Sequence, residues 1–257
     1  LALSTIADEK AGVSREPDMV YLAKLSQRSE HNYVGVKCGI MDQFASAMGK
    51  KDHAIFLNCK TLEYELVPIR LDGYKLVLAN TNKKRSLADS KYNERRGECE
   101  AGFEQIKQAV PGADCLGDVS YAQFQKFSHL ITDDVVRKRV EHVIAEDDRV
   151  LQSVAALKAN DIEAFGKLMV ASHNSLRDLY EVTGIELDTL VDEALKVEGC
   201  IGSRMTGAGF GGCSVSIVHT GAVDSFQERV GKRYEEKIGY APSFYVSDIS
   251  DGGHEMK

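Results

Sequence analysis

The residues best suited to chemistry lie close together in the stretch EHNYVGVKCGIMDQF, from Glu30 to Phe44. Asp42 falls in the first turn of a predicted helix that follows Gly39. Cys38 precedes Asp42 by four residues, a spacing that places both on one face of that turn. We expect apolar side chains to surround the carboxylate, namely those of Ile40, Met41, Phe44 and Met48. From these residues by themselves, Asp42 is either a partner of the helix dipole or a carboxylate available for proton transfer.

A glycine-rich loop is the second feature with chemical potential. The sequence RMTGAGFGGC holds four glycines, and Gly207, Gly209 and Gly212 match the pattern G-x-G-x-x-G of dinucleotide-binding proteins. That pattern binds a pyrophosphate where the loop leaves a strand and opens a helix. Here the residues CSVSIVH follow the loop and predict a strand. We therefore predict no nicotinamide or flavin at this loop, and we expect its glycines to permit close backbone contact and positive φ.

Composition narrows the class of protein. The 257 residues include 43% apolar and 28% charged residues, which is ordinary for a globular protein. A net charge of −7 argues against a general nucleic-acid binder, and no apolar run is long enough to span a membrane. The short basic clusters 83–85 and 95–96 are predicted to be mainly solvated surface, although Arg85 could contact a phosphate. Six cysteines without a C-x-x-C pair favour a reducing compartment, so we expect a cytoplasmic protein.

The elements that must position these residues follow from hydrophobic periodicity and turn signals. The first ten residues have the pattern of the end of a helix, helices are predicted over 16–35 and 39–49, and strands over 53–59, 63–69 and 74–80. Helices then dominate, with Asn160 and Glu163 as a capping pair at the start of one of them. The chain ends with strand, glycine loop, strand, helix and strand. This order indicates an α+β fold, and we expect the division between two domains after residue 75.

Several blocks together resemble the galactokinase family of the GHMP kinase superfamily. They are VGVKCGIMDQF, NTNKKRSLADSKYNERRGECE, SHNSLRDLYEVTGIELD, MTGAGFGGCSVSIV and the final Asp251-Gly252. The blocks occur in the order of the family and extend over nearly the whole chain. The resemblance implies the two-domain GHMP architecture. Residues 1–75 would be the remainder of the N-terminal domain, and residues 76–257 a ferredoxin-like C-terminal domain with extra helices.

The resemblance also implies an activity and roles for single residues. Galactokinases phosphorylate the anomeric hydroxyl of α-D-galactose with ATP and Mg²⁺, which gives galactose 1-phosphate in the first step of the Leloir route. By resemblance, Asp42 is the catalytic carboxylate, and Glu30 is a magnesium ligand. The sugar pocket would be lined by Cys38, Gly39 and Tyr92. The active-site loop, which supports the nucleotide-phosphate loop of the other domain, would be shaped by Gly207, Gly209 and Gly212.

The sequence departs from the family in what it does not contain. The GRVNLIGEHTDY-like segment, which carries the transition-state arginine and sugar-binding residues, does not occur within residues 1–257, and neither does the GLSSSA-like phosphate loop. Lys37 replaces a smaller polar residue of many relatives. We therefore expect an N-terminally truncated galactokinase that is inactive by itself. Such a chain would associate with the missing segment or with a second copy.

Two other functions stay open at this point. One is a regulatory protein that senses galactose and ATP without turnover, although the presence of Asp42 disfavours it. The other is a kinase for a related sugar, such as N-acetylgalactosamine or arabinose, because some of the discriminating groups of the family belong to the segment that the sequence does not contain.

Overall fold

The computed structural model describes residues 10–12, 17–84 and 88–254. The chain divides into two compact units, residues 1–69 with 249–257 and residues 70–248. Arg85 and the helix expected over the first nine residues lie outside the described residues. Membrane-spanning helices, long and apolar enough to cross a bilayer, are absent from the described part of the chain.

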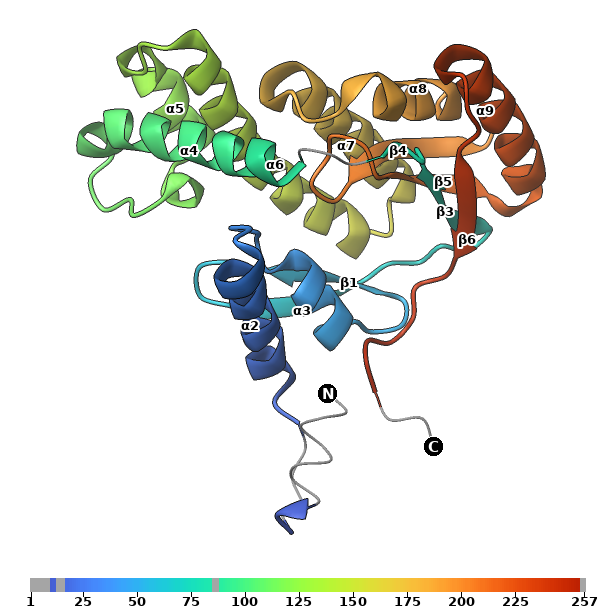
Figure 1. Ribbon diagram of the computed structural model, residues 1–257, viewed down its shortest axis with the longest axis horizontal. Helices are drawn as coiled ribbons and strands as arrows, with labels where there is room; N and C mark the ends of the chain where they lie inside the picture. Colours follow the sequence, from blue (N-terminus) through green and yellow to red (C-terminus); the bar gives the residue numbers. More distant parts are fainter. Residues whose placement is uncertain (1–9, 13–16, 85–87, 255–257) are drawn as a thin grey trace. The chain divides into compact units, whose positions relative to one another are not determined.

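In its described residues, the first unit combines the helices α2 and α3 with a β-hairpin (Figure 1). Its elements are α2 (Met19–Ser29), the π-helical turn η1 (Glu30–Val34), α3 (Met41–Met48), β1 (His53–Leu57) and β2 (Tyr64–Pro68). Helix α2 begins after Asp18, whose carboxylate accepts a hydrogen bond from the backbone N–H of Tyr21 at 2.9 Å. Strands β1 and β2 pair antiparallel. Ala23, Ile40 and Phe44 form the small core of the unit. The helices predicted over 16–35 and 39–49 and the strands predicted over 53–59 and 63–69 are confirmed with shorter bounds, and the first helix ends in a π-helical turn.

Gly49 caps the end of α3, at the residue where the sequence predicts the helix to end. The backbone of Gly49 has φ of −51°, so it does not need the left-handed conformation of a glycine cap. A Cβ at Gly49 would instead lie 2.9 Å from the carbonyl oxygen of Ala45 and 3.1 Å from the backbone nitrogen of Gly252. The N–H of Gly252 donates to the carbonyl of Gly49 at 2.8 Å. Glycine is therefore required here because the C-terminal segment packs directly on the end of α3.

The second unit is built around a four-stranded antiparallel sheet in the order β4-β5-β3-β6. Its strands are β3 (Tyr74–Asn80), β4 (Cys200–Thr206), β5 (Cys213–His219) and β6 (Ser243–Ser247). Helices connect β3 to β4, a hairpin connects β4 to β5, and one helix connects β5 to β6. This order is the ferredoxin-like βαββαβ arrangement with extra helices in its first connection. The predicted α+β fold is confirmed, and β3 lies wholly within the second unit.

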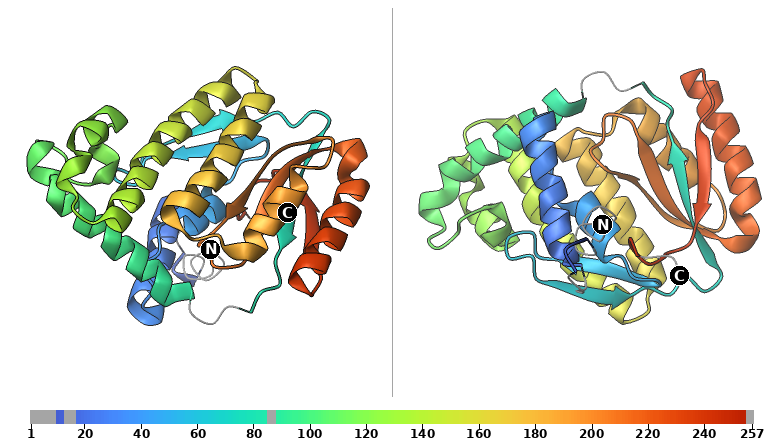
Figure 2. Two further views of the ribbon diagram at one scale, coloured as in Figure 1. Left: turned by 90° about the horizontal axis from the view of Figure 1, so that it is seen from above. Right: turned by 60° about the horizontal axis from the view of Figure 1, so that its bottom comes forward.

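Figure 2 shows the helices of this unit from two further sides. They are α4 (Ala88–Ile106), α5 (Tyr121–Phe127), α6 (Asp134–Lys158), α7 (Ile162–Ser175), α8 (Gly184–Ala194) and α9 (Val223–Ile238), with the π-helical turn η5 (Leu176–Tyr180) and short 3₁₀ turns at Lys107–Ala109, Leu116–Asp118, Ser128–Leu130 and Thr220–Ala222. Helices α8 and α9 cover the sheet through Leu190, Phe226 and Tyr234. Helices α4, α5 and α6 enclose a separate cluster around Phe124 and Ile144.

The predicted capping pair of α7 is wrong. The helix begins after Asp161, whose carboxylate accepts from the N–H of Ala164 at 2.9 Å. Asn160 instead has φ of 57° and ends the turn that follows α6. An aspartate one position later serves the cap better because its side chain reaches the free N–H groups of the first turn.

Candidate active site

The segment from Glu30 to Asp42 starts with a π-helical turn. Glu30 is the first residue of η1, and Gly35 ends the turn with a left-handed backbone, φ of 82°. The carbonyl oxygen of Glu30 accepts from the N–H groups of Gly35 at 2.9 Å and Val36 at 3.3 Å. The carboxylate of Glu30 is half-buried and has no hydrogen bond or ion pair to any residue that the structure describes. Such π-helical turns are frequent at functional sites.

Cys38 is held between the end of α2 and the start of α3. Its carbonyl oxygen accepts from Nε2 of Gln27 at 3.2 Å and lies 2.8 Å from Nε2 of His31. Its Sγ lies 4.0 Å from Nε2 of Gln43. The prediction that Cys38 and Asp42 share a helical face is wrong, because α3 begins at Met41 and Cys38 precedes it. The contacts nevertheless bring the neighbours of Glu30 and of Asp42 together around Cys38.

Asp42 is the acid of the first turn of α3, and its side chain is exposed. The residues expected to surround its carboxylate do not do so, and the hollow that it lines takes its apolar side chains from other positions, such as Met19 and Leu22. Ile40 and Phe44 are only 5% and 1% exposed because they point into the core, while Met41 is 57% exposed. The helical period explains the difference, since residues 40, 44, 47 and 48 form the buried stripe and residue 42 lies on another face. Asp42 lines an open hollow of about 360 Å³ between α2 and α3.

A metal ion would find only separate carboxylates among the described residues, with no cluster of protein ligands. Among them, no group of three or more His, Cys, Asp or Glu side chains could hold a metal ion. Mg²⁺ takes one or two protein carboxylates and completes its octahedral shell with nucleotide phosphates and water. The unpartnered carboxylate of Glu30 fits this kind of site, whereas an all-protein cage would need more ligands.

The glycine loop connects β4 and β5, two antiparallel strands of one hairpin. Strand β5 follows it directly, so the strand predicted after the loop is confirmed. Gly207, Gly209 and Gly212 have φ of 81°, 82° and 87°. A Cβ at Gly209 would lie 2.3 Å from the carbonyl oxygen of Val182, whereas a Cβ at Gly207 would meet nothing within 4 Å. The expected reason for the glycines, close contact and positive φ, is therefore confirmed at Gly209.

Backbone hydrogen bonds hold this loop on both sides. The N–H of Phe210 donates to the carbonyl of Val182 at 2.7 Å, and the carbonyl of Gly212 accepts from the N–H of Thr81 at 2.8 Å. The side chain of Lys83 covers Gly211 and forms an ion pair of 2.9 Å with Glu186 in the first turn of α8. The loop conformation is thus fixed by the segments that follow β3 and precede α8.

The remaining predicted residues of the second unit fall on or next to α4. Tyr92 lies in the first turns of this helix and is half-buried. Arg85 precedes the helix and, as noted, is not among the described residues.

Two arginines of the second unit are buried, which the sequence did not predict. Arg139 is 2% exposed and Arg95 is 7% exposed. The prediction that residues 95–96 are solvated is therefore wrong for Arg95. It is confirmed for Arg96, which is exposed and pairs with Glu100. A signal was available, because Glu98 follows Arg95 by three residues, at the spacing of a helical ion pair.

The two arginines belong to a buried polar region around η5. His142 stacks on Tyr180 with ring centroids 4.5 Å apart, and its Nδ1 lies 2.8 Å from the hydroxyl of Ser175. Burial lowers the pKa of His142 to about 3, and the charges of Arg149, Arg204 and Arg139 add to the effect. Burial also raises the pKa of Tyr180. Nδ1 of the buried His173 accepts from the N–H of Met205 at 3.1 Å.

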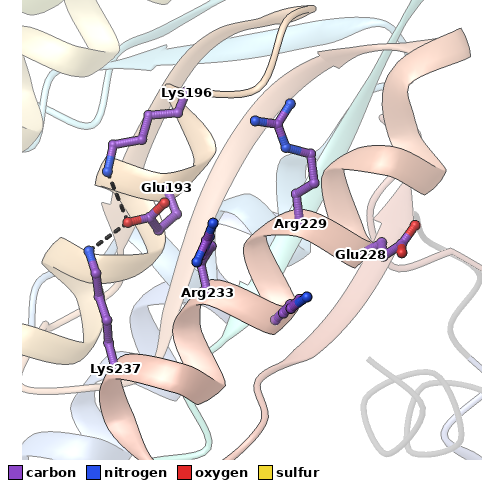
Figure 3. Close-up of a pocket in the computed structure, with 7 residues that line it drawn as sticks. Glu193, Lys196, Glu228, Arg229, Arg233 and Lys237 are labelled. Carbon is purple, nitrogen blue, oxygen red and sulfur yellow. Dashed lines mark hydrogen bonds and ion pairs between the residues drawn. The ribbon is translucent and has the colours of Figure 1, made fainter.

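A groove lined largely by charged residues runs between α8 and α9 (Figure 3). Glu193 accepts from the ammonium groups of Lys196 at 2.9 Å and Lys237 at 2.5 Å, and these partners lower the pKa of its carboxyl group. Arg229 and Arg233 line the groove beside them. None of the residues predicted from the sequence to act in a site lines it.

Comparison with known proteins shows which family and which relatives the chain is similar to. The family described as GHMP kinases C terminal matches residues 153–236. A galactokinase of Halalkalibacterium halodurans is 56% identical over 240 residues, which cover 93% of this chain and 61% of that protein. A galactokinase of Streptococcus suis is 49% identical and is matched by the full length of the chain, which covers 65% of that relative.

A solved structure supports the same relationship. The galactokinase of Lactococcus lactis, determined in complex with galactose, superposes with a TM-score of 0.92 at 41% identity. The superposition covers 98% of this chain and 64% of that structure. The chain therefore spans less than two thirds of the length of these relatives, with the GHMP kinase fold over the part that it covers.

Proposed function

Because the chain belongs to the galactokinase family of the GHMP kinases, we propose that the whole protein phosphorylates the anomeric hydroxyl of α-D-galactose with ATP. The observation that carries the proposal is the segment from Glu30 to Asp42. This segment carries the carboxylates of Glu30 and Asp42, which have no partner among the described residues. Hydrogen bonds to the carbonyl oxygen of Cys38 fix the backbone between them. The galactokinase relatives, 56% and 49% identical, support the choice of galactose.

In this proposal Asp42 takes or orients the proton of the sugar hydroxyl that attacks the γ-phosphate. The exposure of Asp42 within its unit suits this role, since a substrate must reach it. Glu30 would hold Mg²⁺, which supplies neutralisation of the phosphate charge when bound. Cys38 and Gly39 would line the sugar site, with the backbone of Cys38 fixed by Gln27 and His31.

The second unit would contribute the remaining groups. Tyr92 would offer its hydroxyl to the sugar, and Arg85 a guanidinium to a phosphate. The loop with Gly207, Gly209 and Gly212 would support the phosphate-binding backbone of the nucleotide site. We further propose a cytoplasmic location, since the six cysteines are free thiols. Exposed apolar side chains such as Tyr33, 90% exposed, support association of the first unit with another segment or a second copy.

The test is a coupled assay of ADP release by the whole protein with galactose and MgATP. The whole protein is needed because the 257 residues span 61% of the length of a galactokinase relative, and we expect the 257-residue chain by itself to be inactive. Binding of galactose without ADP release would contradict the proposal and favour a sensor. Faster turnover of N-acetylgalactosamine or arabinose would contradict the choice of sugar.

Asp42→Asn is expected to lower kcat by about 10²–10⁴-fold, the usual range for loss of a general base. Folding should be kept, because an exposed acid in a first turn contributes only about 0.3–1 kcal/mol through the dipole. The matched control is Asp72→Asn, an exposed carboxylate in the turn before β3. A kcat within threefold of the unaltered enzyme would show that Asp42 has another role.

A further inference from the structure

We infer that Arg95 and Arg139 are positioning residues for the glycine loop: they fix the backbone of residues 179–182, and the loop is built on that backbone. The catalytic consequence of this inference rests on the proposed function. The structural part does not, and the two can be tested separately.

The guanidinium groups bind three successive carbonyl oxygens at the end of η5. Arg139 donates to the carbonyl of Leu179 at 2.5 Å. Arg95 donates through Nε to the carbonyl of Tyr180 at 2.8 Å and through Nη2 to that of Glu181 at 3.3 Å. Carbonyls at the end of a helical segment lack intrahelical partners and carry the negative end of the dipole. Two cations from α4 and α6 therefore complete the end of this turn.

A shared carboxylate ties the two arginines together. Glu98 accepts from Arg95 at 3.1 Å and from Nε of Arg139 at 3.0 Å. Arg139 also donates to the carboxylate of Glu181 at 2.8 Å. The planar fork of a guanidinium can serve a carbonyl and two carboxylates in fixed directions, which a lysine ammonium cannot reproduce. The identity of these residues as arginines thus matters for the geometry of the turn.

The backbone that the two arginines hold includes a residue in an unfavourable conformation. Glu181 adopts a left-handed conformation, φ of 54° and ψ of 50°, which is uncommon for a residue with a side chain. The next residue, Val182, is 4% exposed, and its N–H donates to the carbonyl of Leu176 at 3.2 Å. The left-handed residue turns the chain so that the carbonyl of Val182 faces the glycine loop.

The loop depends directly on that carbonyl. It accepts from the N–H of Phe210 at 2.7 Å, and the backbone of Gly209 approaches so closely that a Cβ would lie 2.3 Å from it. Phe210 also packs against the buried cluster that contains Val182 and Leu187. A shift of residues 179–182 must therefore move or release Gly209 and Phe210.

The structural part is tested by amide hydrogen exchange on the chain, with Arg139→Lys and Arg95→Lys compared against the unaltered sequence. We expect exchange of the loop peptide 206–213 to speed up at least tenfold in both variants, while peptides from β3 and β6 keep their protection and so report an intact sheet. The control is Arg149→Lys, on the same helix as Arg139. Arg149 pairs with Glu146 at 2.9 Å and no hydrogen bond joins it to residues 179–182. Unchanged exchange of the loop in both test variants would overturn the inference.

The catalytic part is tested in the whole protein by steady-state kinetics. We expect Arg139→Lys to lower kcat at least tenfold and to leave the KM for galactose within twofold, because the sugar groups assigned to the first unit are untouched. Arg149→Lys should leave both values unchanged. Faster loop exchange with an unchanged kcat would overturn the positioning role. An unaltered protein without kinase activity would refute the proposed function instead, and the exchange measurement would still decide the structural part.

Discussion

The turn at Glu30–Val34 in the first unit and the turn at Leu176–Tyr180 in the second have the same backbone construction. Each is a five-residue π-helical turn that directly follows an α-helix and ends on a left-handed residue. In each, the carbonyl of the first residue accepts from the two N–H groups that follow the turn. They differ in the left-handed residue, which is Gly35 in the first turn and Glu181 in the second.

The surroundings explain how a glutamate can occupy the position of a glycine. The first turn carries Tyr33 and Val34, which are 90% and 60% exposed, and a Cβ at Gly35 would meet nothing within 4 Å. There the conformation has to come from glycine itself. In the second turn, Arg95 and Arg139 hold the three carbonyls at the end, so tertiary contacts impose a conformation that Glu181 does not prefer. The first turn is thus stabilised by its own glycine, and the second turn by its contacts with buried arginines.

The largest effect is expected where the second turn supports the glycine loop. Gly209→Ala places a methyl group 2.3 Å from the carbonyl of Val182 and keeps a left-handed backbone, φ of 82°. We expect the free energy of unfolding of the second unit to fall by about 3 kcal/mol, from overpacking and backbone strain together. Gly207→Ala, with similar φ and open space, should cost about 1 kcal/mol. Urea denaturation measures both, and equal losses would show that the contact with Val182 carries no weight.

A smaller effect should follow from charging His142, which stacks on the second turn and has no counterpart in the first. Its pKa is lowered to about 3 in the folded chain, against 6.5 when unfolded, so the unfolded chain binds more protons between these values. The stabilising contribution is present above pH 6.5 and is lost as the pH falls. Between pH 8 and pH 5 we expect a loss of about 2 kcal/mol that His142→Gln does not show. The same pH dependence in the variant would assign it to other groups.

The contrast between the turns also marks what the sequence could predict. The strands 53–57, 64–68 and 74–80, the long helices and the glycine hairpin carry local signals, namely periodicity and turn residues, and these predictions are confirmed, whereas the cap predicted for α7 is wrong. The glycine of the first turn is also a local signal. By contrast, nothing near Glu181 in the sequence indicates a left-handed residue, because Arg95 and Arg139 lie far from it along the chain.

The candidate site shows the same limit. The block around Asp42 could be identified from its residues, and its placement at the start of α3 followed from Gly39 and the helical pattern. The exposure of Asp42 also had a signal in the sequence, since the apolar residues 40, 44, 47 and 48 mark the buried face of α3 and leave residue 42 on another face. The partners of Cys38 had none, because they depend on a loop that folds back between two helices, a contact without a periodic signal.

A third change tests whether glycine itself stabilises the first turn. Gly35→Ala introduces a side chain that meets no other atom but must keep φ of 82°. We expect a loss of about 1 kcal/mol, the usual strain of a left-handed alanine. Thermal or urea denaturation of the first unit measures it. No loss at all would mean that this turn adapts its backbone, and that its conformation does not need glycine.

The smallest effect should come from the reciprocal change, Glu181→Gly. Glycine removes the left-handed strain, worth about 1 kcal/mol. It also removes the ion pair with Arg139, and Glu181 is half-exposed in that pair, so its loss costs at most about 1 kcal/mol. The added flexibility of the unfolded chain costs about 0.5–1 kcal/mol more. These contributions largely cancel, and by urea denaturation we expect a net change between a gain of about 0.5 kcal/mol and a loss of about 1 kcal/mol. A loss well above 1.5 kcal/mol would mean that the Glu181 carboxylate anchors the turn, and the three carbonyl bonds of Arg95 and Arg139 would then be secondary. A clear gain in the free energy of unfolding would mean that the arginines hold residue 181 in a strained backbone that no other contact compensates. The two turns would then differ more strongly, since Gly35 adopts the same conformation without strain.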